Sequence, residues 1–298
     1  MMFEGLKVQR IFRKGLFRPD IRKAYKKVPP SDSWYETINK VHDSLAEIQT
    51  LPHDRPSIFS HDGLRLEAVW YPAEIASDRT VICVHGYTSH AEREWAFPGL
   101  FYHSLGYNVL IPYQRAHGRS EGRYISLGAL EHLDMMAWVD HVNKMIPSGK
   151  ILIHGLSMGG GIVLDLACKD MKNVKCLISD APSMSIDGFF KWMCYDVCKD
   201  KDGRIYAKAM KRFQKEFGVD AQDFDRLNNI AHGRYPLLLS AGSMEGMDEV
   251  LEKLKSRNPM ETQIVILPGC NHGNGMYKQT QVYQSAIKEF LDRHMDGR

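Results

Sequence analysis

The segment from Lys150 to Gly161 leaves this chain few ways to fold locally. Residues of strand character lead into a Gly-x-Ser-x-Gly turn, and apolar residues at helical spacing follow at once. A serine between a strand and a helix is the context that distinguishes this motif from a chance match. Gly155 and Gly159 have a physical reason to be glycine, because side chains flanking a sharply turned serine would collide with backbone. The segment therefore predicts that Ser157 stands exposed above the N-terminus of a helix.

Strand-like and helix-like patterns alternate from residue 56 onwards. Asp62-Gly63, between the apolar segments 57–59 and 64–71, is a strong signal for a β-hairpin. Further strands are expected at 80–84, 107–111, 150–153, 174–179, 236–240 and 263–267, and helices at 95–105, 130–145, 247–256, 281–294 and directly after Ser157. Continuous apolar strands separated by helices predict an α/β fold, with a mostly parallel central sheet and helices on both faces.

Residues 183–229 interrupt this alternation. They carry aromatic and methionine side chains at helical spacing, with no strand between them, and are too long for a connecting loop. We expect a helical insertion that forms a lid over a pocket, and its apolar stripe suggests a hydrophobic acyl or aromatic substrate. The alternative is that these side chains only pack the insertion onto the domain.

Residues 1–50 differ from the main domain, which we place at 51–298. The first 28 residues contain nine lysines and arginines against Glu4 and Asp20, with apolar residues at loosely helical spacing. This pattern is typical of a basic helical extension packed on the domain with its charges in water. The alternative is an amphipathic segment that contacts an anionic membrane surface. Pro29-Pro30 ends the segment, and Ser31 or Asp32 is the expected cap of a helix that runs from Trp34 to about Ile48.

The composition is that of an ordinary globular protein, with 44% hydrophobic and 25% charged residues. A net charge of +3 gives no indication of a nucleic-acid partner. The six cysteines are scattered without a Cys-x-x-Cys pair and without a secretory signal, so we expect free thiols in a cytoplasmic protein. Cys194 and Cys198 lie one helical turn apart, but no further ligands are grouped near them, and no metal is expected.

A serine hydroxyl attacks only when a base accepts its proton, and histidine is the usual base. His272 follows the last predicted strand, at the sheet edge where Ser157 is also expected. Histidines inside helical patterns, such as His132, are expected on the surface. An acid has to orient the imidazole. Glu245, just beyond the strand at 236–240, is the first candidate, and Asp248 and Asp180 are the alternatives.

Acyl transfer also needs donors for the oxyanion of the tetrahedral intermediate. We expect the backbone N–H of Met158, directly after the serine, to be one donor. The second is expected from the loop after the strand at 80–84, at the N–H of Tyr87. His85 in the same loop is expected to orient the turn.

Taken together, these residues resemble the α/β-hydrolase superfamily from about residue 56 to the C-terminus. The matching segments are His85-Gly86-Tyr87, Gln114 to Ser120, Gly155 to Gly159 and Asn271-His272-Gly273. The second segment is similar to a turn in the acylglycerol lipase-like and serine aminopeptidase-like branch, where Arg115 and the glycine would be structural. That branch usually has Asp where Tyr113 stands, and Asp in the acid position that Glu245 occupies here.

The resemblance implies a serine hydrolase that forms an acyl-enzyme on Ser157 and needs neither metal nor organic cofactor. Cleavage of a carboxylic ester, as in esterases and lipases, is the first prediction for its small-molecule substrate. A thioester or a small peptide is the second. A binding protein that keeps the fold without catalysis is the alternative from another class.

Overall fold

The computed structural model describes residues 2–295, and within this range eight strands form one sheet in the order β1-β2-β4-β3-β5-β6-β7-β8. The strands are β1 (Ser57–Phe59), β2 (Arg65–Tyr71), β3 (Arg79–Val84), β4 (Asn108–Pro112), β5 (Lys150–Leu156), β6 (Val174–Asp180), β7 (Leu237–Gly242) and β8 (Thr262–Leu267). The hairpin of β1 and β2 is antiparallel, as is the pairing of β2 with β4, and every later pairing is parallel. The predicted sheet is confirmed.

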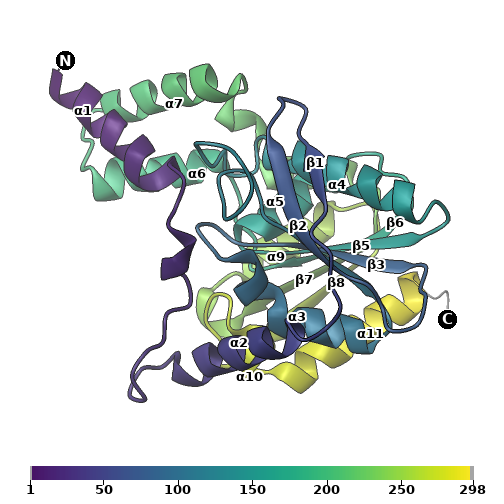
Figure 1. Ribbon diagram of the computed structural model, residues 1–298. Helices are drawn as coiled ribbons and strands as arrows, with labels where there is room; N and C mark the ends of the chain where they lie inside the picture. The colour runs from purple at the N-terminus through teal and green to yellow at the C-terminus, as the bar shows by residue number, and fades with distance from the viewer. Residues whose placement is uncertain (1, 296–298) are drawn as a thin grey trace.

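The helices cover both faces of this sheet (Figure 1). They are α1 (Met2–Ile11), α2 (Tyr35–Ile48), α3 (Ala91–Ser104), α4 (Glu131–Met145), α5 (Met158–Leu166), α6 (Ile186–Lys191), α7 (Arg204–Phe217), α8 (Arg226–Asn229), α9 (Asp248–Arg257), α10 (Gly275–Lys278) and α11 (Thr280–His294). Alternate residues along a strand enter two different cores. On β5, Ile153 packs in the core that contains residues of α4, α5 and α9, and Leu152 packs in the core of α2, α3, α10 and α11.

The insertion at 183–229 is helical and contains α6, α7, α8 and short turns. Two of its aromatic residues, Phe190 and Phe213, belong to the same core as Ile153 of β5 and the buried residues of α4, α5 and α9. Phe190 and Phe213 are fully buried, with ring centroids 5.4 Å apart, and Phe12 of the N-terminal extension packs against Phe190 at 6.2 Å. These aromatic side chains therefore hold the insertion to the extension. The function of the insertion as a lid stays a prediction.

The N-terminal extension packs on the domain at two places. Val8, Ile11, Phe12 and Leu16, from α1 and the following turn, are buried in the core that also contains Ile153 of β5 and residues of the insertion. Further along, α2 packs against α3 (Figure 1). The expected cap of α2 is wrong, because the helix begins at Tyr35 and Asp32 instead accepts the N–H of Trp34 in the preceding turn, at 2.8 Å.

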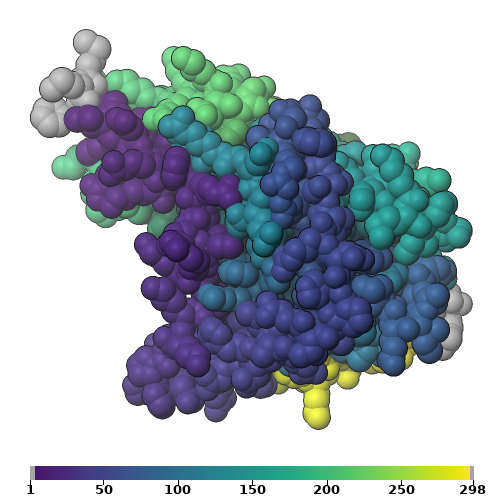
Figure 2. Space-filling model, viewed as in Figure 1, coloured from purple at the N-terminus to yellow at the C-terminus, as the bar shows by residue number. Residues whose placement is uncertain are grey.

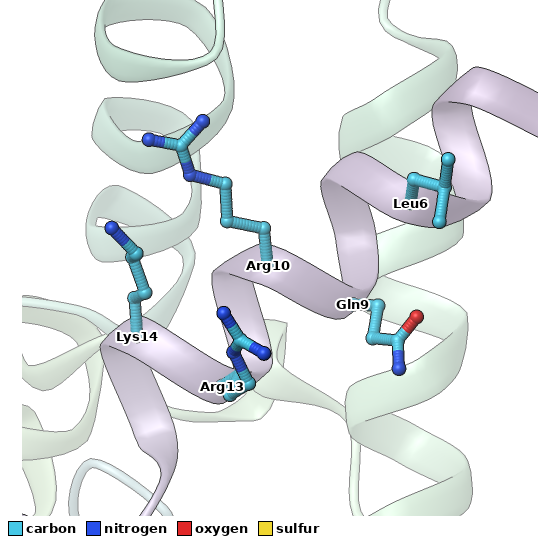
Figure 3. Close-up of a pocket in the computed structure, with 5 residues that line it drawn as sticks. All are labelled: Leu6, Gln9, Arg10, Arg13 and Lys14. Carbon is cyan, nitrogen blue, oxygen red and sulfur yellow. The ribbon is translucent and has the colours of Figure 1, made fainter.

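The opposite face of α1 is basic. Arg10 of α1 projects from this face, as do Arg13 and Lys14 of the π-helical turn that follows (Phe12–Leu16). With Leu6 and Gln9 they line an open groove of about 420 Å³ (Figure 3). Between α1 and α2 the chain, which includes a short 3₁₀ turn at Ile21–Lys23, runs over one edge of the domain (Figures 1 and 2). We call residues 17–34 the strap. Across residues 2–295, no helix has the length and apolar character needed to cross a membrane.

Candidate active site

Ser157 stands on the predicted strained turn between β5 and α5. Its backbone lies at φ 60° and ψ −114°, a conformation that costs energy for a residue with a side chain. The turn is tight enough to demand glycine on both sides, as expected. A Cβ atom on Gly155 would lie 2.2 Å from the carbonyl oxygen of Gly159, and one on Gly159 would lie 1.9 Å from that of Val84. The N–H of Ser157 donates to the carbonyl of Asp180 on β6 at 2.8 Å, which fixes the turn to the sheet.

His272 lies between Ser157 and Glu245 and hydrogen-bonds to both. Its Nε2 is 2.8 Å from Ser157 Oγ, and its Nδ1 is 2.6 Å from Glu245 Oε2. The structure thus brings the predicted nucleophile, base and first-choice acid together in one chain of hydrogen bonds. The pKa of His272 is raised above its usual value because the carboxylate of Glu245 accepts the Nδ1 hydrogen bond and favours the protonated ring. The His272 side chain is 57% exposed, so its ring is accessible from solvent.

Glu245 is positioned by contacts between two neighbouring loops. Its other oxygen, Oε1, accepts the N–H of Gly242 at 2.7 Å, and its side chain is only 8% exposed. The N–H of Met244 donates to the carbonyl of Cys270 at 3.0 Å, which links the glutamate loop to the loop of His272. Both carboxylate oxygens of Glu245 are therefore engaged before any substrate arrives.

The two alternative acids lie elsewhere. Asp248 is exposed in the first turn of α9. Asp180 is buried at the end of β6, where its oxygens accept the hydroxyls of Ser240 at 2.8 Å and Tyr283 at 3.2 Å. Burial raises the pKa of Asp180 to about 6. Neither carboxylate hydrogen-bonds to His272 among the described residues.

The two predicted oxyanion donors flank Ser157. Met158 is the first residue of α5, where the N–H groups of a helix have no partner within it. Tyr87 lies in the loop after β3, and its phenol donates to the carbonyl of Gly15. Across residues 2–295, the N–H groups of Met158 and Tyr87 make no hydrogen bond, so both are free to bind an anionic oxygen.

Glu94 of α3 holds this loop, and the sequence interpretation missed it. Its Oε1 accepts the N–H of Gly86 at 2.7 Å, and its Oε2 accepts the hydroxyls of Ser89 and, at 3.0 Å, Tyr25. Burial raises the pKa of Glu94 to about 7, although the three hydrogen bonds act in the opposite direction. Glu94 precedes the predicted start of its helix, and a charged residue there gives no sequence signal of burial.

A pocket of about 300 Å³ opens beside Ser157 and His272. Its domain side includes Gly86, Tyr87 and Leu156, and its other wall comes from Ala24, Tyr25 and Trp34. No residue of 183–229 belongs to the described lining. The insertion reaches the site only indirectly, where the ring of Phe189 meets that of Tyr87 at 5.8 Å.

The segment around Arg115 has a structural environment. The Arg115 guanidinium is buried and donates to Asp134 at 2.7 Å and to Asp62 at 2.9 Å. His61, Asp62 and Asp134 have the spacing of a metal site, but the cation of Arg115 already lies between the two carboxylates. Tyr113, where the resembling family has Asp, turns its hydroxyl to Glu92. Within residues 2–295 this is the one group of three or more such side chains with the spacing of a metal site.

The structure places two of the predicted histidines, His85 and His132, in the interior. His85 is fully buried and its Nε2 accepts the N–H of Gln114 at 3.1 Å, which fits a role in orienting the turn. His132 was expected on the surface, and this is wrong. It is 6% exposed, because its Nδ1 lies 3.0 Å from the carbonyl of Gly128 and its ring packs on Phe224.

All six cysteines are free thiols, as the sequence predicts.

Comparison with known proteins gives three kinds of match. A family model described as Serine aminopeptidase, S33 matches residues 76–226. The uncharacterized protein YqkD of Bacillus subtilis (strain 168) is 25% identical over 263 residues, which cover 86% of this chain and 84% of that protein.

Among solved structures, the esterase Pf2001 of Pyrococcus furiosus is 26% identical, with 92% of this chain and 99% of that chain covered and a TM-score of 0.64. Est1E from Butyrivibrio proteoclasticus, solved with ferulic acid bound, is 19% identical, with 81% and 99% covered and a TM-score of 0.63. The second likeness concerns the fold. These matches confirm the predicted α/β-hydrolase architecture.

Proposed function

This chain belongs to the serine aminopeptidase S33 family of α/β hydrolases, and on that premise we propose that it is a serine hydrolase that cleaves a carboxylic ester. The observation that carries this proposal is the contact chain from Ser157 Oγ through His272 to Glu245, at 2.8 and 2.6 Å. A nucleophile, a base and an orienting acid in this geometry can activate a hydroxyl for acyl transfer.

The reaction follows from the positions of these groups. Ser157 Oγ attacks the ester carbonyl carbon while His272 Nε2 accepts its proton, and Glu245 stabilises the imidazolium. The carbonyl oxygen becomes an oxyanion and receives hydrogen bonds from the N–H groups of Met158 and Tyr87. His272 then donates the proton to the leaving alkoxide, which departs as an alcohol. Water, activated by the same imidazole, hydrolyses the acyl-enzyme and releases the carboxylic acid.

The pocket favours an ester over a peptide with a free N-terminus. An aminopeptidase has to bind the ammonium group of its substrate, for which a free carboxylate is the natural partner. Glu94 is the only carboxylate among the described residues that line the pocket, and its oxygens already accept hydrogen bonds from Gly86, Ser89 and Tyr25. Its pKa of about 7 also leaves it partly neutral near neutral pH. A thioester has no ammonium group and stays the alternative substrate.

Labelling with a fluorophosphonate probe tests the mechanism. We expect wild type to be labelled and Ser157→Ala and His272→Ala to lose labelling, whereas Ser104→Ala, an exposed serine of α3, behaves as wild type. Turnover of p-nitrophenyl esters is then compared with that of amino-acid p-nitroanilides. Faster cleavage of the anilides would favour an aminopeptidase. A folded wild type without labelling would contradict the hydrolase mechanism and favour a binding protein.

A further inference from the structure

The wall of the pocket opposite the sheet is formed by the strap rather than by the helical insertion. Ala24, Tyr25 and Trp34 line the pocket together with Ser157 and His272. These strap residues lie more than a hundred positions from the serine in the chain, and nothing in the motifs of the hydrolase domain requires them. Figure 2 shows the extension lying over this edge of the molecule.

Specific contacts anchor the strap at this position. The Tyr25 hydroxyl donates to Glu94 Oε2 at 3.0 Å, and the carbonyl of Tyr25 lies 2.9 Å from His42 Nε2 on α2. Arg93 donates to the carbonyl of Ala24 at 2.7 Å. Donors and acceptors on α2 and α3 thus hold the backbone and the ring of Tyr25 in place, so the wall is built into the fold.

The chemistry of this wall is aromatic and apolar. Tyr25 and Trp34 are half-buried, and Leu156 contributes an aliphatic surface from the domain side. A volume of about 300 Å³ is at the small end of ligand pockets. It suits one aromatic ring or a short acyl chain better than a long fatty acid, and aromatic side chains bind such groups by stacking and apolar burial.

We propose that Tyr25 and Trp34 of the N-terminal strap form the subsite that binds the apolar part of the ester, a single aromatic ring or a short acyl chain, beside Ser157. This inference rests on the proposed function. It also gives Tyr25 a positioning role, because its hydroxyl binds the carboxylate that holds the N–H of Gly86 in the oxyanion loop. Substrate recognition by the strap and the shape of the oxyanion loop therefore share Glu94.

Binding without turnover tests the subsite. Phenyl butyrate is the probe, and its Kd is measured by saturation-transfer NMR on the Ser157→Ala protein. On this background we expect Trp34→Ala to raise Kd about tenfold or more, because the aromatic contact is lost. Trp192→Ala is the matched control, since Trp192 is a 54% exposed tryptophan of the insertion outside the pocket lining. It should leave Kd unchanged.

A second variant covers the possibility that Trp34→Ala does not fold. Ala24→Phe keeps every strap contact that involves backbone and fills the pocket, so it should also abolish binding while the thermal midpoint stays near that of the parent. The inference would be overturned if Ala24→Phe kept the Kd of the parent protein. It would also be overturned if Trp192→Ala lost binding and Trp34→Ala did not. Fluorophosphonate labelling distinguishes failure of the proposed function from failure of this inference. If Ser157 is not activated, wild type is not labelled, but the Ser157→Ala protein still binds phenyl butyrate.

Discussion

Ser157 Oγ and His272 Nε2 lie 2.8 Å apart although 115 residues separate them in the chain. The contact exists because β5 and β8 run parallel in one sheet, so the loops that follow them meet at the same edge. Glu245 follows β7, which pairs with β8, and the hydrogen bond from Met244 to Cys270 links their loops. The geometry of the three residues is therefore a property of the sheet.

Glu245→Gln should identify the acid. The amide keeps the shape of the side chain but no longer stabilises the imidazolium, so we expect kcat to fall by a factor on the order of 10⁴. Asp248→Asn is the matched control, because Asp248 is exposed on α9, and it should retain wild-type kcat. Ester hydrolysis under saturating substrate measures both. Full activity in Glu245→Gln together with an inactive but folded Asp180→Asn would transfer the role to Asp180.

The pH dependence of kcat/KM follows from the pKa of His272. Only the neutral ring accepts a proton from Ser157, so activity falls when the ring becomes protonated at low pH. Because Glu245 raises this pKa above the usual 6.5, the midpoint of the acidic limb should lie above pH 6.5. Glu245→Gln should move the midpoint to lower pH in whatever activity remains. A midpoint unchanged by this substitution would show that another group titrates.

Gly159 of the turn and Gly5 of α1 should respond to substitution by alanine in opposite ways. A Cβ on Gly159 would lie 1.9 Å from a backbone oxygen that cannot move without disturbing β3, so Gly159→Ala should lower the free energy of unfolding by about 3 kcal/mol or more. Gly5 has no atom within 4 Å of such a Cβ, so Gly5→Ala should stabilise by about 0.5–1 kcal/mol. Urea denaturation measures both, and a Gly159→Ala protein with wild-type stability would contradict the strained-turn description.

The sheet and the three residues of the contact chain could be predicted because each depends on local patterns. Continuous apolar strands mark the sheet, and Ser157, Glu245 and His272 each follow the end of such a strand. The apolar pattern predicts the start of α3 at Trp95, whereas the helix begins at Ala91, because the charged Glu92 and Glu94 give no sign of burial. The structure buries both, at 4% and 3% exposure, with partners from other elements, and His90 caps the helix.

The wall of the pocket could not be predicted in the same way. Tyr25 and Trp34 belong to a segment rich in lysine, arginine and proline, which has no periodicity that points to a buried site. Their place depends on long-range contacts, such as that between Tyr25 and Glu94, which no local pattern encodes. The aromatic stripe of the insertion suggests a substrate surface, but Phe190 and Phe213 are fully buried in the protein core.

The basic groove of α1 allows a test of membrane contact. Val8 and Ile11 of this helix are buried in the protein, whereas the outward face carries Arg10, Arg13 and Lys14 beside the 55% exposed Leu6 (Figure 3). We therefore expect attraction to an anionic bilayer to be mainly electrostatic. Among the described residues none of the three forms an ion pair, and each basic residue near an anionic surface contributes about 1 kcal/mol. We expect co-sedimentation with vesicles that contain phosphatidylglycerol, and none with purely zwitterionic vesicles.

Charge reversal separates this groove from the general charge of the protein. The triple variant Arg10→Glu, Arg13→Glu, Lys14→Glu should lose vesicle binding. The control Lys144→Glu, Lys172→Glu, Lys175→Glu changes the net charge equally, at exposed sites near the end of α4 and the start of β6, and should keep vesicle binding. Binding of wild type should also disappear at high salt, because screening shortens the reach of exposed charges. Equal loss of vesicle binding in both triple variants would assign the attraction to net charge. Undiminished binding in the first variant would exclude the groove as the membrane contact.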